Sequence, residues 1–127
     1  MIRVFWADEA LGILVWQFLP EWKREDLVAA SLTHQQMYPQ LHRPFCVIVD
    51  VRQANRFPPG ALSVFPTLGA AVRDAPRRAE ALISVGASGL VRVTGEIFAR
   101  TYGARLYFYA EYAEGYTRAV QILTPSL

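Results

Sequence analysis

The sequence predicts an α/β fold, a single domain with an open mixed sheet of about five strands. Short apolar runs alternate along the chain with longer segments in which apolar residues recur every three to four positions, as in helices that cover a sheet. The clearest unit is 44–65, PFCVIVDVRQANRFPPGALSVF, which contains an apolar strand, a polar loop and an apolar helix that starts at a double proline. A length of 127 residues, 53% of them hydrophobic, suits one compact core.

The chain opens with two predicted strands, at 2–6 and 12–18. The gap between them is short enough for antiparallel pairing as a hairpin. A helix is expected next, from Lys23 to Tyr38, and Pro39 ends it because proline cannot continue a helix. The residues predicted to share its inward stripe are Leu27, Ala30, His34, Met37 and Leu41.

Three further strand and helix units follow. The strand 45–51 is apolar at nearly every position, as expected of a central strand covered on both faces. Its helix begins near Pro59, and Pro66 either kinks or restarts it. The predicted inward stripe of this helix consists of Leu62, Phe65, Leu68, Gly69 and Val72.

The next strand is predicted at 82–86, and Ser88 is the expected N-cap of the helix that follows, which Gly103 ends. The buried face of this helix is predicted to carry Leu90, Val93, Ile97 and Phe98. The last unit pairs a strand at 105–110 with a short helix at about 113–123.

The resulting order is ββαβαβαβα. Parallel strands joined by right-handed crossover helices are the economical arrangement, with the first strand antiparallel. We expect a single domain over 1–124 and a short tail at 125–127.

Composition excludes several classes of function. A net charge of +2 from 13 basic and 11 acidic residues is too close to balance to indicate nucleic-acid binding. No apolar run approaches the roughly 18 residues of a membrane-spanning helix, and the N-terminus lacks a signal-peptide pattern, so a cytoplasmic protein is expected. The single Cys46 cannot form an internal disulfide and is expected to be a buried core residue.

No catalytic or metal-binding set is recognisable. His34 and His42 lie eight positions apart, which does not place two ligands on one helical face. Asp50 could act as a base, but pairing with Arg52 or Arg56 is the expected role. The turn VGASG lacks the full pattern of a phosphate-binding loop. We therefore expect no enzyme activity, no cofactor and no metal.

The candidate binding residues lie where strands end, because ligands of open α/β sheets favour the crevice beyond the carboxyl ends of the strands. A polar rim above an apolar interior suits a small anionic or amphipathic ligand. The residues predicted to bind a ligand or a partner are Asp50, Arg52, Asn55, Arg56, Gly60, Ser63, Ser88 and Gly89.

A family resemblance rests on the element order, the strand text CVIVDVR, the loop ending in PPGAL, the segment LISVGASGLVR and the closing aromatic strand. The chain resembles a STAS-type domain, the anti-sigma-factor-antagonist fold, and within this family it resembles the stand-alone bacterial members. The resemblance implies helices mainly on one face of the sheet and a regulatory protein that binds a partner. In signalling members a serine at the start of the helix after the central strand is phosphorylated. The matching stretch, 56–61, has prolines and a glycine instead, and Ser63 lies one turn further along.

Two functions therefore stay open. The first is a non-enzymatic interaction or regulatory module of STAS-like type that lacks the phosphorylated serine. The alternative is a carrier or sensor of a small anionic or hydrophobic, lipid-like ligand. Aromatic residues in the opening hairpin and the last strand place apolar side chains on both sheet faces, so a homodimer, a hydrophobic ligand or the chain's own helices cover the second face.

Overall fold

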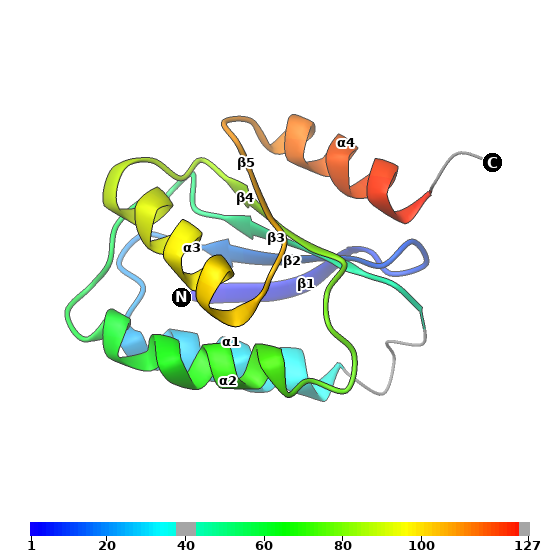
Figure 1. Ribbon diagram of the computed structural model, residues 1–127. Helices are drawn as coiled ribbons and strands as arrows, with labels where there is room; N and C mark the ends of the chain where they lie inside the picture. The colour runs from blue at the N-terminus through cyan, green and yellow to red at the C-terminus, as the bar shows by residue number, and fades with distance from the viewer. Residues whose placement is uncertain (38–42, 125–127) are drawn as a thin grey trace.

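The protein is an α/β domain in which a five-stranded sheet lies between two layers of helices (Figure 1). The computed structural model describes residues 1–37 and 43–124. The strands are β1 (Ile2–Asp8), β2 (Ile13–Phe18), β3 (Cys46–Asp50), β4 (Ala81–Val85) and β5 (Leu106–Tyr109). The helices are α1 (Arg24–Gln36), α2 (Phe65–Arg73), α3 (Gly89–Tyr102) and α4 (Tyr112–Leu123), with a 3-10 turn, η2 (Ala61–Val64), before α2.

The sheet order follows the chain order, β1-β2-β3-β4-β5. β1 pairs with β2 antiparallel and the remaining neighbours pair parallel. Each parallel strand is added on the same side of the one before it, so right-handed crossovers place the connecting helices α1, α2 and α3 on one face. The predicted fold class and element order are confirmed. The predicted tail and the residues Pro39, Leu41 and His42 lie outside the described residues.

One face of the sheet is tightly covered by α4. The side chains of Ile13, Val15, Ile48 and Ile83 on this face are at most 1% exposed. α4 lies close to them through Gly115, where a Cβ atom would be 2.7 Å from Val85 Cγ2. The chain's own helix therefore covers the second face. A homodimer is therefore not needed to cover this face, and the homodimer stays a prediction.

The opposite face is covered by α1, α2 and α3, and here three of the four residues predicted for the buried face of α3 are exposed, while the fourth, Phe98, is half-buried. In α3 the side chains of Leu90, Val93 and Ile97 are 66, 51 and 56% exposed. The helix instead turns Gly95 toward the sheet, where a Cβ atom would be 3.5 Å from Phe108. Tertiary packing selected the face with the smaller residue because α3 also has to accommodate large aromatic rings beside it.

The segment before α2 also differs from the prediction. Residues 61–64 form a separate 3-10 turn, and α2 starts again at Phe65 with Pro66 in its first turn, where a proline is tolerated. The restart that Pro66 predicts is confirmed. Leu62 belongs to the 3-10 turn, whose period differs from that of α2, and it is 49% exposed instead of facing inward.

Candidate ligand-binding cavity

The first predicted rim residues, Asp50 and Arg52, form a closed pair at the end of β3. Asp50 is 3% exposed, and its carboxylate accepts hydrogen bonds from Arg52 Nε at 2.9 Å, Arg52 Nη2 at 2.8 Å and the Arg52 backbone N–H at 3.1 Å. This carboxylate raises the pKa of Arg52. The guanidinium also lies over the ring of Tyr112, 5.0 Å from its centroid. The two charges neutralise each other. Because Arg52 also contacts Tyr112, the pair connects the end of β3 to α4.

Asn55 and Ser88 tie two neighbouring loops together. Asn55 Nδ2 donates to Ser88 Oγ at 2.8 Å, and the Ser88 backbone N–H donates to Asn55 Oδ1 at 3.2 Å. Ser88 is the N-cap of α3, as predicted, but its hydroxyl makes no cap hydrogen bond, and Gly89 next to it has a positive φ of 55°. The amide and hydroxyl thus hold the loop after β3 against the loop after β4.

Gly60 and Ser63 lie apart from these pairs, around η2. Gly60 adopts a left-handed conformation with φ 79°, and the exposed Ser63 donates its hydroxyl to the Gly60 carbonyl at 2.6 Å. The predicted binding residues are therefore distributed over separate local contacts. Arg56 is the exception, because it is exposed and has no ion pair with any described acidic residue while it lines a cavity.

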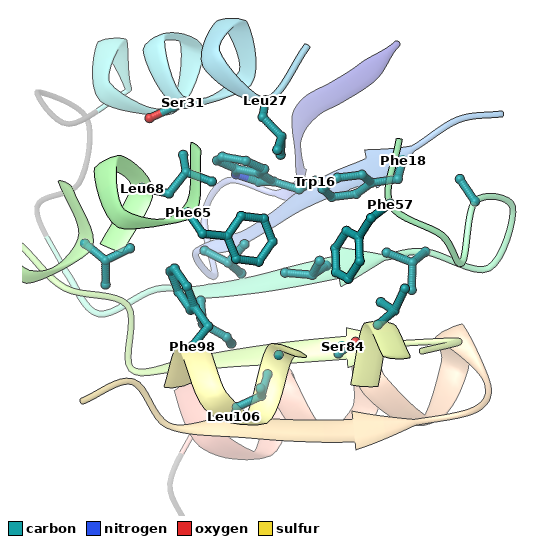
Figure 2. Close-up of a pocket in the computed structure, with 18 of the residues that line it drawn as sticks. Trp16, Phe18, Leu27, Ser31, Phe57, Phe65, Leu68, Ser84, Phe98 and Leu106 are labelled. Atoms are coloured by element: carbon teal, nitrogen blue, oxygen red, sulfur yellow. The ribbon is translucent and has the colours of Figure 1, made fainter. Parts of the chain in front are cut away.

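This cavity lies between the sheet and the helices α1, α2 and α3. Its volume is about 220 Å³. Figure 2 shows aromatic side chains from several elements pointing into the same space, among them Trp16 of β2, Phe65 of α2 and Phe98 of α3. The remaining apolar lining includes Phe18, Leu27, Val47, Val49, Phe57, Leu68, Leu82, Leu106 and Phe108.

The cavity lies beside α2, whose Phe65 and Leu68 line it together with Val49 of the sheet. The main neighbours of α2 are α3 and η2, and no strand is among them. Phe65 meets Phe57 and Phe98 edge to face, with ring centroids 5.6 and 5.8 Å apart. These edge-to-face contacts join the loop before η2, α2 and α3 beside the cavity. Val49, in the central strand, is only partly buried, whereas Ile48 on the opposite face is 0% exposed.

Few polar groups reach the cavity wall. Trp16 Nε1 donates to His34 Nδ1 at 3.1 Å, and burial lowers the pKa of His34 to about 4, so the imidazole is neutral at pH 7. Trp22 is 2% exposed, and its Nε1–H has no acceptor among the described residues. Two hydroxyls, of Ser31 and Ser84, complete the set. Among the described residues that line the cavity none is acidic.

Other kinds of site find no support in the described parts of the chain. No group of three or more His, Cys, Asp or Glu residues there could hold a metal ion. Within 1–37 and 43–124, no helix is long and apolar enough to span a bilayer. Cys46 is buried as predicted, and burial raises the pKa of its thiol to about 11.

Sequence reasoning placed Arg56 on a polar rim above an apolar interior, but it did not predict which aromatic residues line the cavity. The signal in the sequence was the number of large aromatic residues, Phe57, Phe65 and Phe98 in particular, in segments that pack on one sheet face. Their count alone could not show that they leave space between them.

No protein-family model, curated protein or solved structure matches this chain. The resemblance to STAS-type domains therefore stays a prediction that rests on element order and on the sequence segments quoted above.

Proposed function

We propose that this chain is a non-enzymatic binding protein for small apolar molecules, a carrier or sensor. The observation that carries the proposal is the cavity of about 220 Å³ between the sheet and helices α1 to α3. Protein interiors are normally packed as densely as organic crystals, so an apolar space of this size is unusual inside a small domain. Filling it with a ligand would restore the contacts that the lining side chains lack.

The size of the cavity limits the ligand. An engineered apolar cavity of about 150 Å³ binds benzene, so the present cavity holds about nine non-hydrogen atoms by proportion. Typical pockets for drug-sized molecules start at about 300 Å³. The expected ligand is therefore a single substituted ring or a short branched chain.

Binding can be measured with small aromatic probes such as toluene, indole and 3-phenylpropanol. We expect these probes to raise the melting temperature and to change the tryptophan fluorescence, since Trp16 and Trp22 both line the cavity. Absence of any shift at millimolar concentration for the whole panel would contradict the proposal.

A cavity-filling variant makes the test specific. Gly95 lines the cavity, so Gly95→Leu places a side chain in the ligand's space and should abolish probe binding. A cooperative melting transition of this variant without probe shows that it folds, so that loss of probe binding reports on the filled cavity. Thr101→Leu, at an exposed position of α3 outside the cavity, is the matched control and should bind probes like the wild type.

Protein interaction is a second candidate function, which the resemblance to STAS-type domains also implies. The observation that favours it is the row of exposed apolar side chains on α3, Leu90, Val93 and Ile97, which recur at helical spacing. If the row binds a second copy of the chain, light scattering at micromolar concentration should give twice the mass of 14.3 kDa. A mass of one chain would leave a different protein as the partner to be sought.

A further inference from the structure

We infer that the ligand of this cavity is a small monoanion, a carboxylate on an aromatic or branched aliphatic body, whose charged group binds Arg56 at the mouth. The inference rests on the proposed function, since it names the chemical class of molecule that the cavity accepts. It follows from the charges and donors around the cavity and from its size.

Arg56 is the one charged side chain among the described residues that line the cavity. Neighbouring arginines are neutralised by carboxylates: Arg52 by Asp50 at 2.8 Å and Arg24 by Glu25 at 3.9 Å. Arg56 has no such partner in the described chain, and it is an exposed residue that also lines the cavity, so we place the binding of the charged group at this residue. A guanidinium presents paired N–H donors that fit a carboxylate, and with no lining acid nearby the mouth favours anions over cations.

The wall behind Arg56 offers donors and little that would repel an anion. Ser31 and Ser84, which also line the cavity, carry hydroxyl groups, and a hydroxyl can donate a hydrogen bond to an oxygen of a ligand. His34 is held against Trp16 by the indole hydrogen bond and is neutral, so Arg56 supplies the cavity's positive charge at pH 7.

The dimensions then define the body of the ligand. A cavity that accepts about nine non-hydrogen atoms fits the carbon skeleton of 3-phenylpropionate, with the carboxylate outside among the polar groups of the mouth. Longer lipid chains exceed this volume, so the occupant is an aromatic acid or a short-chain acid.

The test uses three probes with nearly the same body: 3-phenylpropionate, its neutral amide and 3-phenylpropylamine. Titration calorimetry on the full chain at pH 7.5 and low salt should show that the carboxylate binds about tenfold more tightly than the amide, since a charge-assisted hydrogen bond at a partly exposed site contributes about this factor. The amine should bind most weakly. Raising the salt concentration to 0.5 M should weaken the carboxylate and leave the amide unchanged.

Arg56→Gln should reduce the carboxylate affinity about tenfold to that of the amide, while the amide affinity stays the same. Arg100→Gln removes the same charge from an exposed position of α3 outside the cavity and is the matched control, expected to bind like the wild type.

The outcomes separate this inference from the proposed function. If the amide and the carboxylate bind equally, or if Arg56→Gln weakens both probes alike, the inference is overturned and the apolar binding function stands. If no probe binds to the wild type, both are overturned. Preference for the carboxylate that disappears in Arg56→Gln alone supports the inference.

Discussion

His34 is the residue whose surroundings most change its chemistry. Its Nδ1 accepts the hydrogen bond from Trp16, which requires a neutral ring, and burial lowers its pKa from 6.5 to about 4. The ring of Trp16 also meets the imidazole edge to face, with centroids 5.7 Å apart. A histidine in these contacts is a wall residue of the cavity that keeps its neutral form across the physiological pH range.

This pKa predicts how stability depends on pH. The unfolded chain binds a proton on His34 below pH 6.5, whereas the folded protein does so only near pH 4, so the free energy of unfolding falls as the pH is lowered between these values. The loss attributable to His34 is up to about 3 kcal/mol, because burial makes its pKa lower in the folded protein than in the unfolded chain.

Urea unfolding at pH 4.5, 5.5, 6.5 and 7.5 measures this dependence. His34→Gln, which cannot be protonated, should show a flatter profile than the wild type over the same range. Equal slopes in the two proteins would contradict the assignment to His34.

Among the secondary-structure elements, α2 and α3 show how two helix glycines can have opposite roles. Gly69 in α2 lies against the ring of Tyr102, where a Cβ atom would come within 2.2 Å of ring carbons. Gly95 in α3 faces Phe108 at 3.5 Å, an ordinary contact distance. The first glycine is needed for the close approach of the two helices, and the second is not required by contacts.

The same substitution at these two glycines should therefore have effects of opposite sign. Gly95→Ala should stabilise the protein by about 0.5–1 kcal/mol, because alanine restricts the unfolded chain and favours the helix. Gly69→Ala should destabilise it by about 2 kcal/mol, because the methyl group forces Tyr102 and the helices apart. Urea unfolding of both variants measures the difference, and a stabilised Gly69→Ala would show that α2 and α3 do not pack as closely as described.

Considered as a whole, the molecule is packed differently on the two faces of its sheet. On the face that α4 covers, Ile13, Val15, Ile48 and Ile83 are almost completely excluded from water, whereas on the other face buried residues such as Leu14 lie beside residues such as Val49 that border the cavity. The helices lie on both sides of the sheet (Figure 1), and the cavity is on the side of α1, α2 and α3.

A matched pair of substitutions tests this asymmetry. Val15 on the α4 side is 1% exposed, whereas Val49 lines the cavity and is partly exposed. Val15→Ala should cost about 2–3 kcal/mol, because it removes buried methyl groups and leaves a new void. Val49→Ala should cost about 1 kcal/mol, since its side chain already borders empty space. Equal losses in urea unfolding would argue against a difference in packing between the faces.

Prediction from the sequence was most successful where the signal is local. Four predicted features follow from neighbouring residues, and the structure confirms them. They are the apolar strand β3, the hairpin of β1 and β2, the end of α3 at Gly103 and the restart of the helix at Pro66. The candidate site was harder, because Asp50, Arg52, Asn55 and Ser88 are polar at the predicted rim but satisfy one another in pairs. A sequence does not show which polar groups already have partners.

The sequence by itself determined the order of the elements and the parallel sheet with its antiparallel first strand. Periodicity and turn residues act between neighbours in the chain, so they can be read without the fold. Only the tertiary structure decided that α3 turns Gly95 inward, that α4 closes the second face, and that Phe65 and Phe98 point into one space beside the sheet. These features depend on the volumes of side chains that are distant in sequence, and the cavity is what those volumes leave unfilled.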